Sequence, residues 1–395
     1  SEFGGSAWTW HESTEQYYYH AFLPEQPDLN WYNPQVRQAM TDVMQFWLDK
    51  GVDGFRVDVV WHLIKDKHLR DNPPNADYDA AIHSPYEALI PAYSADQADV
   101  HEVVAEMRKV INEYNERLLI AEVYAPIATL VKYYGLQQSG AQLPFNFHLF
   151  STSWDAAHLR EVIDEYESSV PEDEWPNWVL GNHDQPRITS RVGCLQARSA
   201  AVLLLTLRGT PTLYYGDELG MRNVPIASEE AMDPRGLNSP GKGLGRDSYR
   251  TPMQWTPGRN AGFSESTPWL PLADDFQKCN VESERADPNS MLSLYQRLIA
   301  LRQNAPALCV GEYEPINVSP PLLAYRRYHG ENDSFVIALN ISGEHRPFWL
   351  PEDTGTARLV LSTEDVLPQE EKLAGEILLR PNEAAIIQIG SGKSF

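Results

Sequence analysis

The chain has 395 residues, of which 42% are hydrophobic and 22% are charged, so it is long enough for one large and one small domain. Lys and Arg total 32 and Asp and Glu total 55, which gives a net charge of −23. A chain this acidic repels phosphate backbones and anionic lipids, so we expect no nucleic-acid partner, no membrane partner and a neutral or cationic ligand.

The first half of the chain alternates predicted helices with short apolar runs. Asn33 is followed by Pro34, a pair typical of a helix start, and apolar residues with helical spacing continue as far as Gly51. Strand-like runs are predicted at residues 52–60, 118–122, 143–147, 178–184 and 210–215, and further helices at 97–114, 159–166 and 198–207. This alternation predicts a parallel sheet with crossover helices.

Acidic residues follow four of these predicted strands, at Asp58, Glu122, Asp184 and Asp217. A (β/α)8 barrel places its active site at the C-terminal ends of its strands. A doubly wound sheet would also bind ligands there, but no Gly-rich phosphate loop follows any of the strands. We therefore predict an α/β fold of the (β/α)8 TIM-barrel type.

The second half of the chain changes character twice. Residues 217–287 are rich in Gly, Pro, Asn and Asp and predict a long irregular excursion, and a last helix is predicted at 291–302. Short alternating runs then follow at residues 322–328, 334–340, 346–350, 358–361, 377–379 and 384–389. They predict a small C-terminal antiparallel β-sandwich domain.

Cysteine is rare in this chain. Cys194, Cys279 and Cys309 are few, odd in number and far apart, so neither a disulfide framework nor a zinc motif is indicated. This usage suits a reducing compartment, and we predict a cytoplasmic location.

The strand-end carboxylates suit glycoside hydrolysis, in which one carboxylate attacks the anomeric carbon and one carboxylic acid protonates the departing oxygen. Arg56 lies two residues before Asp58, so both side chains point to one face of a strand, and the cation favours an ionised Asp58. Glu122 follows an apolar strand, where burial would raise its pKa. The alternative is a structural ion pair, which is the commoner role for any one such carboxylate.

Several motifs resemble the α-amylase clan, glycoside hydrolase family 13. Residues 54–59 (GFRVDV), 120–122 (IAE) and 182–184 (NHD) match three of its sequence regions, in the right order. Residues 26–30 (QPDLN) match the fifth region in the form found in the α-glucosidase and oligo-1,6-glucosidase branch. The likeness continues through the segments 5–8 (GSAW), 185–187 (QPR), 216–220 (GDELG) and 250–255 (RTPMQW).

Carried over position by position, the resemblance implies that Asp58 is the nucleophile and Glu122 the general acid/base. Asp184 would stabilise the oxocarbenium-like transition state. Arg56 would orient and ionise Asp58, and His183 would donate to sugar hydroxyls near the scissile bond.

The resemblance also implies a ring of substrate-binding residues. Arg187 would line the leaving-group side, with a surface salt bridge as the alternative. Arg250 would close the pocket around the non-reducing-end glucose, with a buried structural arginine as the alternative and an acidic partner expected from outside this segment. Phe3 and Phe147 would flank the sugar, and core packing explains each of them equally well.

The implied activity is that of a retaining exo-α-glucosidase that releases the non-reducing-end glucose of short neutral α-1,4- or α-1,6-glucosides. In the branch that the chain resembles, a valine directly after the nucleophile tends to accompany α-1,6 activity, so Val59 implies tolerance of α-1,6 bonds, and a strand-core valine is an equally good explanation. One alternative is a transglucosylase or sucrose isomerase of the same branch. Another is a non-catalytic transporter heavy-chain ectodomain, which the intact carboxylates disfavour.

The family's first region has no match in residues 1–25, and five barrel strands can be identified where eight are needed. The predicted domains are therefore 1–32, the remainder of a loop domain inserted after the third barrel strand; 33–308, a portion of the catalytic barrel; and 309–395, the β domain. We expect such an open arc to be poorly stable alone, or completed by a second polypeptide supplying the N-terminal barrel half. No cofactor and no metal ligand are expected in this segment. A structural calcium or magnesium ion would belong to the absent N-terminal part.

Overall fold

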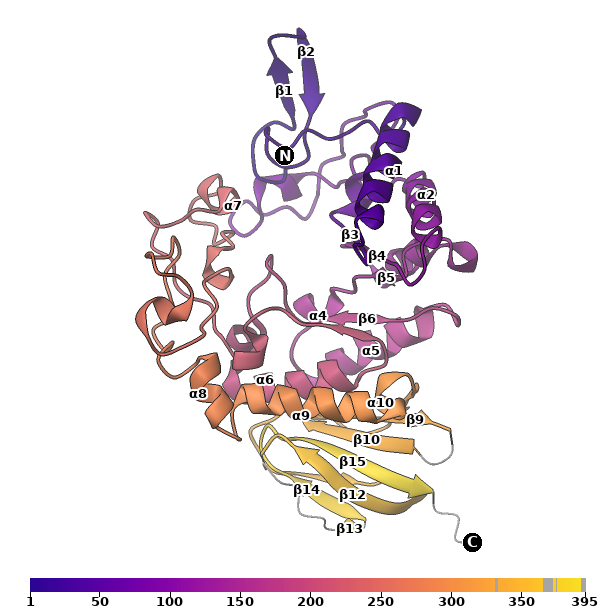
Figure 1. Cartoon of the computed structure of the whole chain (residues 1–395), viewed down its shortest axis with the longest axis vertical. Coiled ribbons are helices and arrows are strands. Elements are labelled where there is room, and N and C mark those ends of the chain that lie inside the picture. Colours follow the sequence, from indigo (N-terminus) through magenta and orange to yellow (C-terminus); the bar gives the residue numbers. More distant parts are fainter. Residues whose placement is uncertain (331–332, 365–371, 374, 392–395) are drawn as a thin grey trace. The chain divides into compact units, whose positions relative to one another are not determined.

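The structure is a computed structural model that describes residues 1–330, 333–364, 372–373 and 375–391 (Figure 1). These residues form two compact units, which we describe separately. The first unit consists of Ser1–Asn146, Ser169–Trp175 and Ala227–Asp247. The second unit consists of Phe147–Ser168, Pro176–Ile226 and Ser248–Phe395.

The first unit contains a parallel three-stranded sheet with strand order β3-β4-β5. Helix α1 begins where the sequence predicts, because the Asn33 side chain accepts a hydrogen bond from the amide of Gln35 and Pro34 starts the first turn. Helix α2 packs against β4. The elements are β1 (Trp8–His11), β2 (Gln16–Tyr19), α1 (Pro34–Asp49), β3 (Gly54–Val57), α2 (Val100–Asn112), β4 (Leu118–Ala121), α3 (Ile127–Leu130), β5 (Leu143–Pro144) and α7 (Pro234–Leu237).

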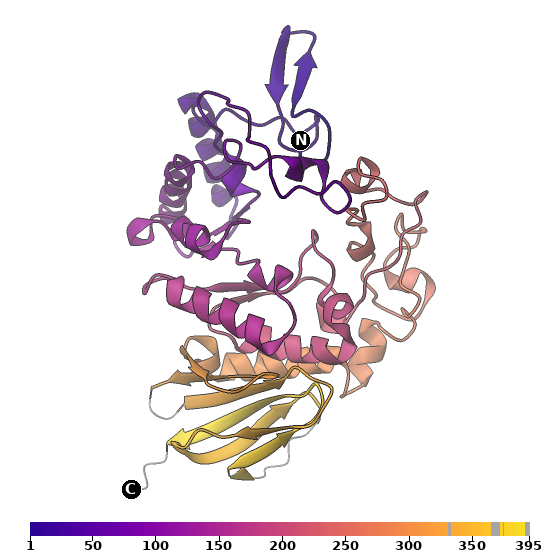
Figure 2. The ribbon, with the colours of Figure 1, turned by 180° about the vertical axis from the view of Figure 1, so that it is seen from behind.

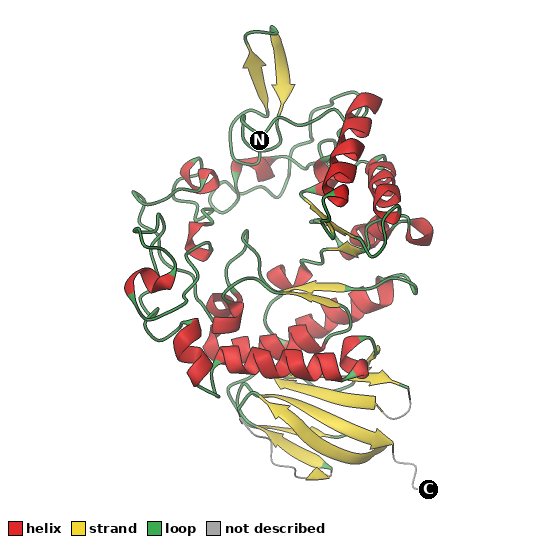
Figure 3. Ribbon diagram, viewed as in Figure 1, coloured by secondary structure: helices red, strands yellow, loops and turns green. Residues whose placement is uncertain are grey.

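Two features of this unit differ from the sequence-based predictions. The strand predicted at 52–60 ends at Val57, because the backbone of Val59 turns into the left-handed region and a 3-10 helix follows at Val60–His62. The antiparallel hairpin β1–β2 was not predicted, and Figure 3 shows its two strands near the N-terminus.

The second unit contains the parallel pair β6–β7 and the helices that follow these strands. Helix α6 is longer than predicted, because it continues across a kink at Gly193, whose φ is 83°. The region predicted to be irregular at 217–287, part of which (Ala227–Asp247) belongs to the first unit, contains only short helical turns within the described residues. The elements are α4 (His148–Ser151), α5 (Ala156–Ser169), β6 (Asn177–Val179), α6 (Ile188–Thr206), β7 (Thr210–Thr212), α8 (Val281–Ala286), α9 (Met291–Asn304) and α10 (Pro306–Cys309).

The C-terminal part of the second unit consists of two antiparallel sheets (Figure 2), with strand orders β13-β12-β15-β10-β9-β8 and β11-β14. Val336 and Ile387 from the larger sheet lie in one buried core with Phe348 and Leu379 from the smaller sheet. The predicted antiparallel sandwich is therefore confirmed. Its strands are β8 (Glu312–Ile316), β9 (Leu322–His329), β10 (Asp333–Asn340), β11 (Arg346–Trp349), β12 (Thr354–Ser362), β13 (Lys372–Leu373), β14 (Glu376–Leu379) and β15 (Ala384–Ser391).

Candidate active site

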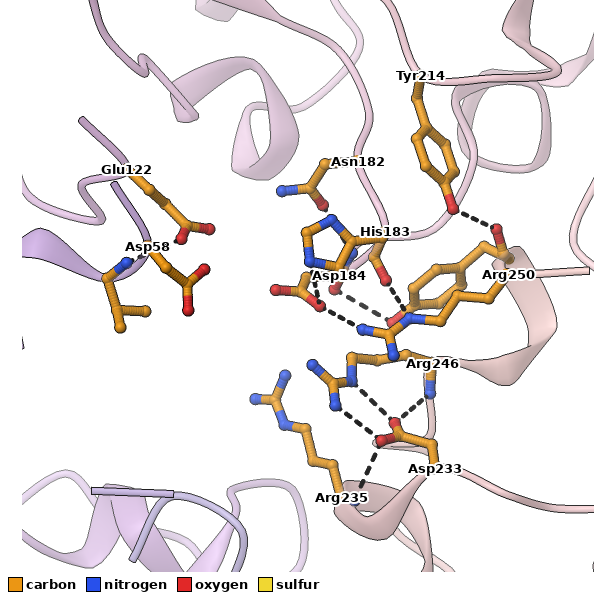
Figure 4. Close-up of polar contacts among 12 residues, drawn as sticks. Asp58, Glu122, Asn182, His183, Asp184, Tyr214, Asp233, Arg235, Arg246 and Arg250 are labelled. Atoms are coloured by element: carbon orange, nitrogen blue, oxygen red, sulfur yellow. Dashed lines mark hydrogen bonds and ion pairs between the residues drawn. The ribbon is translucent and has the colours of Figure 1, made fainter. Parts of the chain in front are cut away.

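Two of the predicted site carboxylates lie at neighbouring strand ends in the first unit. Strands β3 and β4 are parallel and pair Val57 with Ala121, so Asp58 and Glu122 are the next residues of the two strands. Figure 4 shows their carboxyl groups beside each other. The parallel register brings together two residues that are 64 positions apart in the sequence.

A single arginine contacts both carboxyl groups. Arg56 Nη1 pairs with Asp58 Oδ1, and Arg56 Nη2 lies 2.6 Å from Glu122 Oε2. Because strand residues two apart point to the same face, the Arg56 side chain reaches the end of its own strand and that of β4. The guanidinium is a planar donor with several N–H groups, so it can serve two carboxylates at once.

The two carboxyl groups differ sharply in their environment. The Asp58 side chain is 69% exposed, whereas that of Glu122 is 2% exposed. Burial raises the pKa of Glu122 from 4.5 to about 7, while the Val59 amide and Arg56 oppose the rise and the hydrogen bond and charge of Asp58 add to it. The pair thus places the exposed Asp58 side chain beside a buried Glu122 whose raised pKa favours its protonated form.

Asp184, the third predicted carboxylate, belongs to the second unit, where it follows β6. Arg250 Nη2 lies 2.6 Å from Asp184 Oδ1, and Arg250 Nε donates to the His183 carbonyl at 2.7 Å. His183 Nε2 lies 3.5 Å from the same Oδ1 atom (Figure 4). Within the described residues Arg250 thus pairs with Asp184, and the acidic partner expected from outside this segment stays a prediction. The Tyr249 hydroxyl, which sequence reasoning missed, donates to the Asp184 carbonyl at 3.1 Å.

Three other predicted substrate-binding residues are buried. Arg187 is fully buried in the second unit, where its guanidinium stacks on Tyr214 and Tyr215 and donates to the Tyr215 carbonyl at 2.6 Å. Phe147 is buried and stacks on Phe150, with ring centroids 4.9 Å apart. In the first unit the buried Phe3 lies under the Arg246 guanidinium, 5.0 Å from the ring centroid. This burial favours packing, and sugar contacts for the three stay predictions.

The fourth strand-end acid, Asp217, has a structural environment. Asp217 is 2% exposed, and this burial raises the pKa of its carboxyl group from 3.8 to about 7. The positive charge of Arg187 opposes part of the rise. Asp217 is thus held within the protein, unlike the exposed Asp58.

Another ion pair in the first unit has no signal in the sequence motifs. Asp233 is buried and accepts hydrogen bonds from Arg246 Nε at 2.9 Å and Arg246 Nη2 at 2.7 Å (Figure 4). The two residues are 13 positions apart in an irregular segment, so no periodicity could have paired them. The pair fixes the segment that carries Arg246 over Phe3.

Clustered metal ligands and membrane-spanning helices are absent from the described residues. Among them, no group of three or more His, Cys, Asp or Glu side chains is arranged to hold a metal ion. Within the same part of the chain, none of the helices combines the length and apolar character needed to cross a membrane.

Parallel strands that end in a carboxyl pair, followed by an antiparallel β domain, place the chain among barrel-type α/β proteins. Residues 1–311 match the family described as alpha amylase, catalytic domain, and the chain belongs to this family. A solved alpha-glucosyl transfer enzyme matches 99% of this chain and 74% of its own, with a TM-score of 0.88 and 33% identity. The predicted fold class, a TIM-barrel α/β domain followed by an antiparallel β domain, is confirmed.

The curated relatives differ in their described roles. An alpha-glucosidase of Apis mellifera is 34% identical over 352 residues, which cover 87% of this chain and 61% of that protein. An oligo-1,6-glucosidase of Parageobacillus thermoglucosidasius is 34% identical over 98% of this chain and 74% of its own length. A human amino acid transporter heavy chain is 36% identical over 86% of this chain and 50% of its own length. The chain thus spans about 61% of the first of these relatives.

Proposed function

We propose that this chain is part of a retaining exo-α-glucosidase, with Asp58 as nucleophile and Glu122 as general acid/base. The observation that carries the proposal is a pair of carboxyl groups at the ends of β3 and β4 that differ in burial. Asp58 is exposed, Glu122 is buried with its pKa raised to about 7, and Arg56 contacts both. A retaining glycosidase needs two neighbouring carboxyl groups with different protonation states.

In the first step an Asp58 oxygen forms a bond to the anomeric carbon as the glycosidic bond breaks, and Glu122 gives its proton to the departing oxygen. In the second step Glu122 takes a proton from water while the water oxygen attacks the anomeric carbon and releases Asp58. We propose that Asp184 stabilises the positive charge that develops on the sugar, with Arg250 and His183 holding its Oδ1 atom. This role for Asp184 rests on its motif and on the contacts within its own unit. The reaction needs no cofactor.

The proposed substrates are short neutral oligosaccharides with α-1,4 or α-1,6 bonds. A net charge of −23 disfavours anionic substrates. One relative is named an oligo-1,6-glucosidase, which supports α-1,6 bonds, and another is named an alpha-glucosidase, which supports α-glucosides in general. A cytoplasmic location stays a prediction that rests on cysteine usage.

We also propose that a further polypeptide segment, a strand with its following helix, pairs with the open edge of β3. In its sheet β3 pairs with β4 alone, and a groove of about 230 Å³ lies between α1, α2 and β3. The groove is lined with apolar side chains that include Met40, Phe55 and Val57, and parallel strands are normally covered on both faces. A monomeric 395-residue chain that unfolds cooperatively and resists proteases would contradict this proposal.

The direct test of the function is Asp58→Asn in the natural full-length protein, assayed with maltose and isomaltose. Loss of the nucleophile is expected to lower kcat by on the order of 10⁴-fold or more. The matched control is Asp53→Asn, since the Asp53 side chain is 93% exposed and lies before β3. Unchanged turnover in Asp58→Asn would remove Asp58 from the mechanism, and an inactive parent would favour the heavy-chain alternative.

A transglucosylase or sucrose isomerase is the second candidate, because one of the solved structures that the chain matches is an alpha-glucosyl transfer enzyme. The two candidates differ in whether water or a second sugar attacks the glycosyl-enzyme. Products formed from concentrated maltose or sucrose separate them. Free glucose as the main product supports hydrolysis, whereas transfer products would overturn it.

A further inference from the structure

Val59, the residue after Asp58, has an unusual backbone. Its φ is 37° and its ψ is 48°, which lies in the left-handed region. A β-branched side chain is strained in this conformation, so the surrounding structure must hold it there. Backbone strain of this kind is often found where a group has to be aimed at a functional site.

The turn at Val59 changes which amide continues the ladder between β3 and β4. The Glu122 amide donates to the Val57 carbonyl at 3.0 Å, as in a regular parallel pair. In such a pair the next bond runs from residue 59 to the Glu122 carbonyl. In the structure Val60 makes this bond, at 3.2 Å. The Val59 amide is thereby released from the ladder.

The released amide donates to the carboxyl group of Glu122. The distance from Val59 N to Glu122 Oε2 is 3.0 Å, and Arg56 Nη2 lies 2.6 Å from the same oxygen. Because Oε2 receives two donors, it cannot also carry the acidic proton without losing one of them. The proton of a protonated Glu122 therefore belongs on Oε1.

We propose that the backbone amide of Val59 is a positioning group that fixes Glu122 through Oε2 and leaves Oε1 for proton transfer. The proposal rests on the proposed function for its catalytic meaning, because an acid/base residue must present one defined oxygen to the substrate and then to water. The charged groups that act on Glu122 within the first unit are Arg56 and Asp58. A hydrogen bond to the ionised form also keeps the buried acid able to lose its proton.

The first test uses the natural full-length protein labelled with ¹⁵N-valine and ¹³C-glutamate. The Val59 amide resonance is expected to titrate with the same midpoint as the Glu122 carboxyl carbon, near pH 7, and to stop titrating in Glu122→Gln. A Val59 resonance that does not follow Glu122 would overturn the proposal. This measurement needs no activity, so it remains decisive even if the chain turns out not to hydrolyse glucosides.

The second test removes the amide alone, by incorporating the α-hydroxy analogue of valine at position 59. Loss of a hydrogen bond to a charged acceptor is expected to raise the Glu122 midpoint by about one to two pH units. The matched control is the same replacement at position 60, which removes the ladder bond to the Glu122 carbonyl and leaves the carboxyl group untouched.

Two side-chain variants complete the second test. Val59→Gly and Val59→Asn accept the left-handed conformation and keep the amide, so they are expected to leave the midpoint unchanged. In an active enzyme the alkaline limb of kcat/KM should move with the midpoint in the position-59 analogue alone. An unshifted midpoint in that analogue would overturn the proposal, and an equal shift in Val59→Gly would assign the effect to packing.

Discussion

Replacing Arg56 by Met removes the cation that contacts both Asp58 and Glu122 and keeps a long unbranched side chain. Two unit charges about 4 Å apart attract by about 4 kcal/mol at an effective dielectric constant of about 20, which equals about 3 pH units. The Arg56 side chain is 33% exposed, so solvent screens part of this attraction. We therefore expect the pKa of Glu122 to rise by about one to two units above its value of about 7.

The assay is a ¹³C titration of the Glu122 carboxyl group, assigned with Glu122→Gln, together with the pH profile of kcat/KM. The alkaline limb is expected to move upward in Arg56→Met and by less in Arg56→Lys, which keeps the charge and loses the planar fork. Arg117→Met is the matched control, because Arg117 lies before β4 at the other end of the strand and pairs with Asp53. A Glu122 midpoint that is unchanged in Arg56→Met, or shifted as much in Arg117→Met, would refute the reasoning.

Two further predictions concern stability. Burial raises the Asp217 pKa from 3.8 to about 7, so the folded chain keeps a proton that the unfolded chain releases, and the free energy of unfolding falls as pH rises through this range. Urea unfolding measured at pH 4–7 should show a smaller decrease in the free energy of unfolding in Asp217→Asn than in the parent, with a difference of about 4 kcal/mol at most. An equal decrease in both proteins would contradict the raised pKa of Asp217. Phe348→Ala, in the core between the two C-terminal sheets, should cost about 3–5 kcal/mol, whereas Phe263→Ala, at a 50% exposed residue, should cost about 0.5 kcal/mol.

The sequence predicted the elements whose signals are local. Helix α1 begins at the Asn33–Pro34 pair because the cap is formed by adjacent residues, and its hydrogen bond is present in the structure. The alternating runs of the C-terminal part became strands because residues two apart share a face and the buried face is apolar. Arg56 and Asp58 were expected on one face for the same reason, and the structure places them in contact.

The features that sequence reasoning missed depend on contacts between distant residues. Valine favours strands, so nothing in the run at 52–60 marks Val59 as a left-handed turn. The partner of Arg250 is 66 residues away at Asp184, and no local pattern could have identified it. Arg187 was expected beside a ligand because it follows a motif, yet aromatic rings from the segment after β7 bury its guanidinium. In each case the tertiary fold supplies the partner.

The difference in exposure between the Asp58 and Glu122 side chains comes from the backbone, because both residues follow strands of one parallel pair and both carry a carboxyl group. After β4 the chain continues into the interior, where Val123 is 1% exposed, so the Glu122 side chain stays buried. After β3 the chain turns at Val59, and Asp58 is left largely exposed. The same turn supplies the amide that lowers the pKa of Glu122 against the effect of burial. A straight continuation of β3 would bond residue 59 to the Glu122 carbonyl and would leave Arg56 as the only charged donor to Oε2 in the first unit. Glu122 would then be harder to ionise, and the second step, in which it takes a proton from water, would be slowed.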